Sequence, residues 1–199
     1  MTRPIRVRLD AQALLPDTTE VAARLKIKKT DAADETVRRA LDTLLPHLSP
    51  VFSYVVAPVS INGNAVDAGF GEFESASLAR HLRGCGECAV MALTLGAGAD
   101  RYLASLSLTS PAAHFLADGL ASAMAEAACD EAERIILAGR KTPGRFSPGY
   151  GDFPLSLQPK VLSLTDAGRL LGVTLSPSLL MSPSKSVTAV IGFLQEPQN

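Results

Sequence analysis

The chain has 199 residues, 47% of them hydrophobic and 20% charged, which is an ordinary soluble composition with enough length for one domain or two small lobes. Lys and Arg number 19 against 20 Asp and Glu, and the formal net charge of −1 excludes a general electrostatic attraction to nucleic acid or anionic lipid. No apolar run approaches the roughly 18 residues of a membrane span, and the N-terminal MTRPIRVRLDAQALL lacks the apolar core of a signal peptide. Together with an odd number of cysteines, three, these features favour a cytoplasmic protein.

The first part of the chain combines helical and strand patterns. Ile5–Leu9 alternates apolar and basic side chains, which predicts a short edge strand. Helices are predicted at Asp17–Leu25 and Asp31–Leu45, and the basic stretch Lys26–Lys29 between them is typical of a solvated surface. The elements predicted next are a strand at Val51–Val59, a turn at Asn62–Asn64 and a helix at Glu74–Leu82.

The longest predicted element is a helix in the second part of the chain. Ser110 is a candidate N-cap, Pro111 suits the first helical turn, and an Ala-rich run continues to the helix-ending Gly139. Its apolar stripe consists of Leu116, Leu120, Met124 and Ala128. Before it, the apolar run Ala89–Leu95 is typical of a strand buried on both faces, although a buried helix segment fits the same pattern. After it, the patterns predict helices at Leu155–Leu164 and Asp166–Leu171, a strand at Ser186–Phe193 and a disordered tail at Gln195–Asn199.

Helices and strands alternate irregularly, without repeated strand–helix–strand units. This order predicts an α+β fold, with a mixed or antiparallel twisted sheet and packed helices, in preference to a doubly wound parallel fold. We expect one compact unit, in which residues 1–60 form an N-terminal α/β segment and residues 61–199 form the core.

The connector RFSPGYGDFPL, at Arg145–Leu155, has the composition of a ligand-binding loop. Gly149 and Gly151 flank Tyr150 and permit positive φ angles and close backbone approach to a ligand. Arg145 offers a planar fork of donors for a carboxylate or phosphate, and Tyr150 offers a ring for a flat or cationic group. The composition fits equally a clamp for a small ligand and a surface turn in which Arg145 is solvated and Tyr150 packs.

Other chemical motifs are weaker. Cys85-Gly86-Glu87-Cys88 has the spacing of a redox dithiol or of half a metal site, but turn cysteines entering a buried strand are the preferred interpretation. His47, His81 and His114 lie in different elements, and no metal site is predicted. The P-loop, Rossmann and zincin motifs are all absent from the sequence. The stretch Ser182–Ser186, which includes a lysine, fits either anion binding or a polar turn.

Two blocks of the chain resemble one known family. Arg145, Gly149 and Tyr150 match the Arg-x-x-x-Gly-Tyr signature of the activation domain of cobalamin-dependent methionine synthase, which binds S-adenosylmethionine. Met181–Val187 matches that domain's second block, Met-x-Pro-x-x-Ser-Val. The phrases RFSPGYGDFPL and MSPSKSVTAVIG are still more similar to free-standing activation-domain-like proteins, which are found beside truncated methionine synthases or corrinoid methyltransferases.

The resemblance implies an S-adenosylmethionine site. The connector residues that it assigns to this site are Arg145, Ser147, Pro148, Gly149 and Tyr150. A helix glutamate of the family falls on Ser122 in this sequence, and Glu126 lies one turn further along the same face, so Glu126 is the candidate acid. The family's N-terminal aspartate has no match that the sequence can place.

The resemblance also implies a reaction and its partners. In the family, one-electron reduction of cob(II)alamin gives a nucleophilic Co(I), which takes the methyl group of S-adenosylmethionine. This sequence has no Asp-x-His-x-x-Gly corrinoid motif, so cobalamin would be carried by a separate methionine synthase or methyltransferase, with a reductant such as flavodoxin or ferredoxin. The chain would then be a subunit of a methyltransferase system, with neither nucleic acid nor membrane as a partner. The alternative is a non-catalytic adaptor of the same fold that docks on a corrinoid protein without using S-adenosylmethionine.

Overall fold

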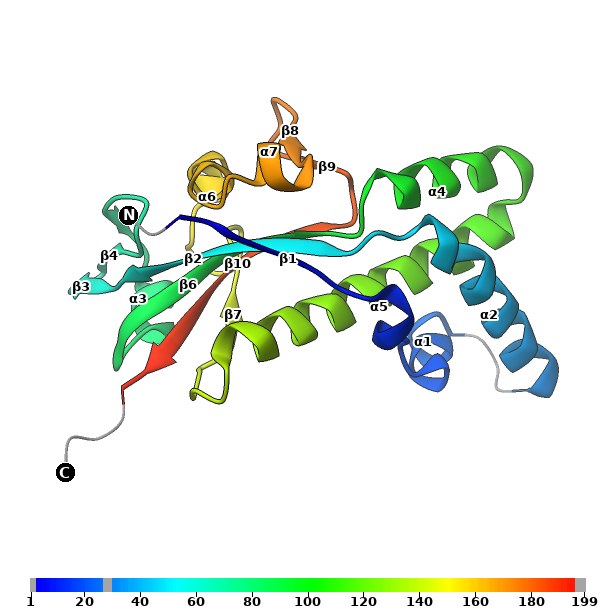
Figure 1. The fold of residues 1–199 in the computed structure, drawn as a ribbon, viewed down its shortest axis with the longest axis horizontal. Coiled ribbons are helices and arrows are strands. Elements are labelled where there is room, and N and C mark those ends of the chain that lie inside the picture. The colour runs from blue at the N-terminus through cyan, green and yellow to red at the C-terminus, as the bar shows by residue number, and fades with distance from the viewer. Residues whose placement is uncertain (1–2, 27–29, 196–199) are drawn as a thin grey trace.

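A five-stranded antiparallel sheet forms the centre of the protein, whose computed structural model describes residues 3–26 and 30–195 (Figure 1). Its strands, in spatial order, are β1 (Ile5–Arg8), β2 (Val51–Pro58), β6 (Cys85–Thr94), β10 (Ser186–Leu194) and β7 (Arg145–Phe146). Each neighbouring pair runs antiparallel. The predicted α+β class is therefore confirmed, and β1 lies at the edge of the sheet, as its alternating side chains predicted.

The central strands are apolar because both faces of the sheet are covered. Val90 of β6 pairs with Val190 of β10, and both belong to the core on one face, while their neighbours Ala89 and Ile191 belong to the core on the other. The prediction of a buried strand at Ala89–Leu95 is confirmed. The strand begins earlier, at Cys85, which lies opposite Leu194 of β10. The interpretation of the two cysteines as turn residues is therefore wrong, because backbone pairing with β10 extends through them.

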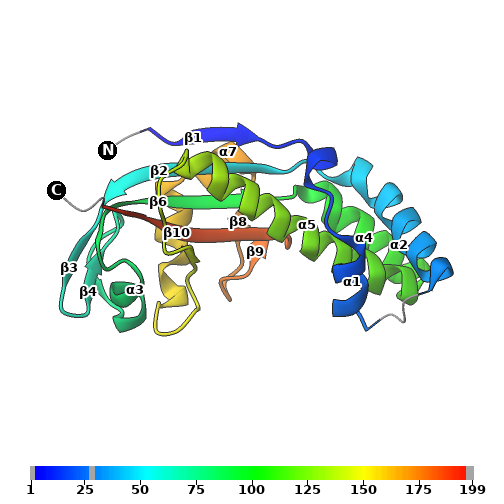
Figure 2. The ribbon, with the colours of Figure 1, turned by 90° about the horizontal axis from the view of Figure 1, so that it is seen from below.

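Helix α5 (Pro111–Leu137) covers one face of the sheet, as the two views show together (Figures 1 and 2). The Ser110 hydroxyl accepts a hydrogen bond from the Ala113 amide, which confirms the predicted N-cap, and Pro111 occupies the first turn. All four residues of the predicted apolar stripe are buried. The helix ends at Ala138 in the left-handed conformation, immediately before Gly139.

Helix α4 (Ala97–Thr109) precedes α5 and was not predicted. Its pattern is weak, because only Ala99 and Leu103 are buried and serines and threonines interrupt its apolar positions. Tertiary packing on α5 replaces the missing sequence signal.

The N-terminal helices pack beside α5. The predicted pair is confirmed as α1 (Thr18–Arg24), whose N-cap is Asp17, and α2 (Asp31–Leu44). Two 3-10 turns, η1 (Ala11–Leu14) and η2 (Leu45–His47), connect these helices to β1 and β2. Most of the predicted basic stretch Lys26–Lys29, and the predicted tail beyond Gln195, lie outside the described residues. No helix within residues 3–26 and 30–195 combines the length and the apolarity that a bilayer crossing requires.

The opposite face of the sheet is covered by short elements. The predicted helices appear as α3 (Ala76–His81), η3 (Leu155–Leu157), α6 (Gln158–Leu164) and α7 (Ala167–Leu171). The small strands that were not predicted are β3 (Ser60–Asn62), β4 (Ala65–Asp67), β5 (Phe73–Glu74), β8 (Thr174–Leu175) and β9 (Met181–Ser182). They form a three-stranded and a two-stranded sheet. Strands of two or three residues are too short for an alternating pattern to develop.

Candidate functional site

Arg145 meets a group of carboxylates on helix α5. Its Nη1 atom lies 2.8 Å from Oε2 of Glu133 and 2.8 Å from Oδ1 of Asp130, and its Nη2 atom lies 3.6 Å from Oε2 of Glu126. Residues 126, 130 and 133 lie on one face of a helix, because they are spaced by four and three positions. The structure thus brings together two residues that the resemblance assigned to the site, Arg145 and Glu126, and adds Asp130 and Glu133.

The cluster carries an excess of negative charge, because three carboxylates surround one guanidinium. The side chain of Arg145 is 22% exposed and that of Glu133 is 17% exposed, whereas Glu126 and Asp130 are 60% and 72% exposed. Burial alone would lower the pKa of Arg145, but the bond with Asp130 and the surrounding negative charges raise it above the ordinary value. The guanidinium therefore stays charged, and the two exposed acids are accessible to a cationic group.

The connector after β7 is anchored on both sides of Tyr150. Phe146 and Phe153 stack on each other with centroids 6.3 Å apart, and Phe153 is buried in the second core. Asp152 accepts hydrogen bonds from the Ser75 hydroxyl at 2.7 Å and from the backbone amides of residues 76 and 77 at the start of α3. These donors hold the pKa of Asp152 well below its ordinary value. The connector is therefore a fixed loop and not a solvated linker.

The predicted loop residues form the turn of this connector. Gly149 has a φ angle of +93° and its amide donates to the Phe153 carbonyl, while the Tyr150 amide donates to the Ser147 carbonyl. Pro148 is buried, and Tyr150 is 68% exposed. The backbone amides of Gly149 and Tyr150 are thus already hydrogen-bonded within the loop. The Tyr150 ring lies on the surface, away from the core.

Lys185 links the second block to the other end of the same helix face. Its Nζ atom lies 2.8 Å from Oδ1 of Asp118 and donates to the Ser122 hydroxyl at 2.9 Å. Ser184 contacts Asp100 of α4 through its amide and its hydroxyl. The sequence left open whether this stretch binds an anion or forms a polar turn. In the structure Asp118 is the anion that Lys185 binds, so the turn is tied to α5.

A polar stripe therefore runs along α5 between two cations. Asp118, Ser122, Glu126 and Asp130 follow one another at intervals of four residues. Lys185 engages the N-terminal end of the stripe and Arg145 the C-terminal end. Glu126 lies between these ends and has the weakest contact of the three acids around Arg145, at 3.6 Å. Of the acids in this stripe, Glu126 is therefore the one for which Arg145 and Lys185 compete least with a cationic group of a ligand.

A hollow of about 240 Å³ adjoins this stripe. Glu126 and Asp130 line it from α5, and Asp17 lines it from the start of α1. One Asp17 oxygen accepts a hydrogen bond from the Thr19 amide at 2.8 Å. Sequence reasoning had found no N-terminal aspartate for the site. In the sequence Asp17 was recognisable only as the N-cap of a helix. The packing of α1 on α5 places Asp17 beside Glu126.

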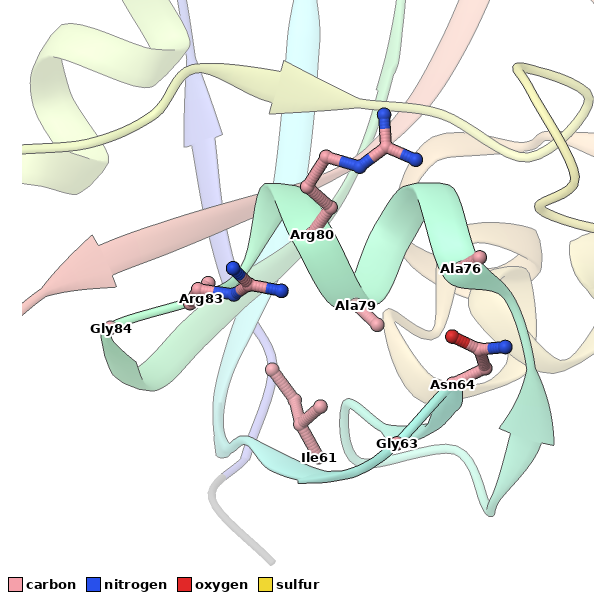
Figure 3. A pocket seen from close by; sticks show the side chains of 8 residues that line it. All are labelled: Ile61, Gly63, Asn64, Ala76, Ala79, Arg80, Arg83 and Gly84. Atoms are coloured by element: carbon pink, nitrogen blue, oxygen red, sulfur yellow. The ribbon is translucent and has the colours of Figure 1, made fainter.

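A second hollow, of about 430 Å³, lies between the turn of β3 and β4 and helix α3 (Figure 3). The Arg83 guanidinium lies on the side of Ile61, whereas that of Arg80 extends away from the turn (Figure 3). Neither side chain has a hydrogen bond or ion pair within the described part of the chain. Because the two arginines do not converge, they do not hold one anion together, and we leave this hollow outside the candidate site.

The cysteines and histidines do not form a reactive or metal-binding group. Burial raises the pKa of Cys88 to about 12 and also raises that of Cys85, which disfavours thiolate chemistry. His81 and His114 donate to the carbonyl oxygens of Gly144 and Leu103, so the hydrogen-bonding capacity of these two histidines is used within the fold. Residues 3–26 and 30–195 contain no cluster of three His, Cys, Asp or Glu side chains that could hold a metal ion.

Comparison with solved structures identifies the architecture. The chain superposes on a crystal structure of the MetH reactivation domain bound to AdoHcy with a TM-score of 0.73, over 99% of this chain and 80% of that chain. The fold is that of the MetH reactivation domain. The match confirms the resemblance that the two sequence blocks indicated, although the two chains share only 16% of their residues. No family model and no curated protein sequence matches the chain.

The shared fold explains the spacing of the two blocks. In this reactivation-domain fold β7 pairs with β10, so that Arg145 lies opposite Ile191 and Phe146 opposite Val190. The first block begins in β7 and the second leads into β10, and the two blocks are therefore neighbours on the sheet although residues 151–180 separate them in the sequence. Helix α5 packs against β10 and β6 and supplies the acids.

Proposed function

We propose that this chain binds S-adenosylmethionine at the cluster of Arg145 with the acids of α5. The observation that carries the proposal is the pairing of Arg145 with Glu126 and Asp130, within a fold whose solved representative binds AdoHcy. S-adenosylmethionine has a carboxylate, an ammonium group and a sulfonium group, and so a net positive charge. The three acids and one arginine of the cluster complement this distribution of charge.

Each part of the ligand has a candidate partner among the described residues. The Arg145 guanidinium suits the carboxylate, because its fork of donors binds two oxygens at once. Glu126 and Asp17 line one hollow and suit the ammonium group. Ser147, Pro148, Gly149 and Tyr150 offer carbonyl oxygens and an exposed ring for the adenosine part. The absence of a P-loop from the sequence agrees with a ligand that has no phosphate.

We further propose that the chain acts in trans, as an activation subunit of a corrinoid-dependent methionine synthase or methyltransferase. The bound S-adenosylmethionine supplies a methyl group for reduced cobalamin on that partner, and a flavodoxin or ferredoxin supplies the electron. The contribution of this chain is to hold the sulfonium in a fixed orientation at an open face, since orientation alone accelerates a bimolecular transfer. The proposal follows the free-standing form that the phrases RFSPGYGDFPL and MSPSKSVTAVIG resemble.

Calorimetric titration with S-adenosylmethionine tests the binding step. We expect saturable binding that is weakened at least tenfold in Arg145→Ala, because a charge-assisted contact to a buried carboxylate is worth about 1.5–3 kcal/mol. Arg134→Ala is the matched control, because Arg134 lies on α5 and pairs with Glu131, outside the cluster. Absence of saturable binding, or equal losses in the two variants, would refute the proposed site.

The alternative is an adaptor that docks on a corrinoid protein without using S-adenosylmethionine. The observation in its favour is that Ser122, at the position of the family's glutamate, is already bound to Lys185. The two functions differ in one reaction. Mixing the chain with a cob(II)alamin-loaded partner, a reductant and S-adenosylmethionine should give the absorbance spectrum of methylcobalamin if the chain is an activation subunit. A stable complex without that spectrum would favour the adaptor.

A further inference from the structure

Arg145 is shared unequally by its acidic partners. Its Nη1 atom donates a hydrogen bond to Glu133 at 2.8 Å and forms an ion pair with Asp130 at the same distance. The Glu133 side chain is 17% exposed, whereas that of Asp130 is 72% exposed. Glu133 is thus a fixed partner enclosed with the guanidinium, and Asp130 is a partner that approaches from solvent.

The exposure of Asp130 makes its contact replaceable. A carboxylate that is largely hydrated loses little when it leaves an arginine, because water takes over its hydrogen bonds. Leaving is costly for Glu133, since a partly buried carboxylate would lose its charge partner without gaining full hydration. An incoming carboxylate of the same geometry can therefore take the place of Asp130 and not that of Glu133.

We propose that Asp130 occupies the ligand-carboxylate position on Arg145 in the free protein and is displaced when the ligand binds. The inference rests on the proposed function and adds how the site distinguishes ligands with a carboxylate from ligands without one. Glu133 acts as a positioning residue that keeps the guanidinium at the site, and Asp130 acts as an internal competitor. A ligand without a carboxylate leaves the Arg145–Asp130 pair intact, whereas a ligand with one must exchange with it.

The competition sets the size of the expected effect. An exposed arginine–carboxylate pair contributes up to about 1 kcal/mol, so removing Asp130 should favour a carboxylate-bearing ligand by about threefold to fivefold. Loss of the Asp130 charge also weakens attraction to any cationic ligand. That second effect is common to ligands with and without a carboxylate. The ratio of the affinities for one ligand of each kind therefore reports only the displacement of Asp130 by the ligand carboxylate.

The test compares S-adenosylmethionine with its decarboxylated analogue by calorimetry. We divide the affinity for S-adenosylmethionine by the affinity for the decarboxylated analogue. This ratio should rise about threefold to fivefold in Asp130→Asn and should fall in Glu133→Gln. Glu131→Gln is the matched control on α5, because Glu131 pairs with Arg134, and the ratio should not change. A structural role alone would move both affinities together.

Three distinguishable results would overturn the inference. If S-adenosylmethionine binds to the wild-type protein but the ratio is unchanged or lower in Asp130→Asn, Asp130 is not a competitor and the proposed function stands. If neither ligand binds to any variant while circular dichroism shows that each is folded, the proposed function fails and the inference fails with it. A ratio that changes equally in Glu131→Gln would refute the assignment to Asp130.

Discussion

Gly151 lies where the connector touches helix α3. Gly151 has a φ angle of +54°, and a Cβ atom added there would lie 2.6 Å from the Ser77 hydroxyl oxygen and 2.8 Å from the Ser77 Cβ atom. Gly151→Ala therefore adds a left-handed backbone cost and a steric conflict. The neighbouring Asp152 binds the same helix start, so the conflict falls on the anchor of the loop.

The two costs can be separated with a second glycine. Gly63 has a φ angle of +63°, and nothing lies within 4 Å of a Cβ atom added to it. Gly63→Ala should therefore lose only the backbone cost, about 1 kcal/mol of unfolding free energy. Gly151→Ala should lose about 3 kcal/mol, because overpacking adds about 1–3 kcal/mol. For a chain of this size these losses correspond to decreases in Tm of about 2–4 °C and about 6–12 °C.

Urea denaturation followed by circular dichroism measures both losses, and calorimetry measures binding of S-adenosylmethionine. Binding should weaken in Gly151→Ala and remain unchanged in Gly63→Ala, since only Gly151 lies in the connector. Equal losses of unfolding free energy in the two variants would refute the reasoning, because the steric conflict with Ser77 would then cost nothing. Full stability with lost binding would instead place Gly151 directly against the ligand.

The connector and the second block allow three more tests. Phe153→Ala removes a ring that is 1% exposed and stacked with three others, and should cost about 3–5 kcal/mol of unfolding free energy in urea. Asp152→Asn should destabilise the protein at neutral pH, and its effect should fade as the pH drops below about 4. The reason is that the donors around Asp152 lower its folded-state pKa, so its stabilisation is present above the unfolded-state pKa and is lost on protonation; denaturation curves across pH measure it. Lys185→Met should lower the unfolding free energy by about 1 kcal/mol in thermal denaturation, because its partner Asp118 is half-exposed, whereas Lys160→Met should have no effect because Lys160 is exposed. A loss below about 1 kcal/mol for Phe153→Ala, a pH-independent effect of Asp152→Asn, or equal Tm values for the two lysine variants would contradict these expectations.

Much of the fold could be predicted because its signals are local. The cap at Ser110, the proline after it and the apolar stripe of α5 are encoded within the helix itself. The continuous apolar run in β6 likewise reports burial on both faces. Helix α4 escaped prediction because its packing, and not its own pattern, makes it a helix. The extension of β6 to Cys85 depends on pairing with Leu194, which lies far away in the sequence.

The candidate site was only partly predictable, for a related reason. Arg145 was found through its motif, and Glu126 was found by moving one turn along a predicted helix face. Asp130 and Glu133 continue that face at helical spacing, so the signal for them existed, but nothing in the sequence indicated which face Arg145 would meet. Asp17 had no such signal, because only the packing of α1 on α5 places it beside Glu126.

Two cationic bridges fasten helix α5 to the segments that carry the two sequence blocks. Lys185 and Arg145 contact opposite ends of the α5 stripe, and about 18 Å of helix separates Asp118 from Asp130. Each bridge needs only one cation in a sequence block and one acid on the facing turn of α5. The sheet requires only that β7 pair with β10, which is a backbone property. In the proposed site, the position of an acid along the stripe, and not the type of acid, decides where a ligand with both charges binds, and Glu126 and Asp130 supply the negative charge close to Arg145.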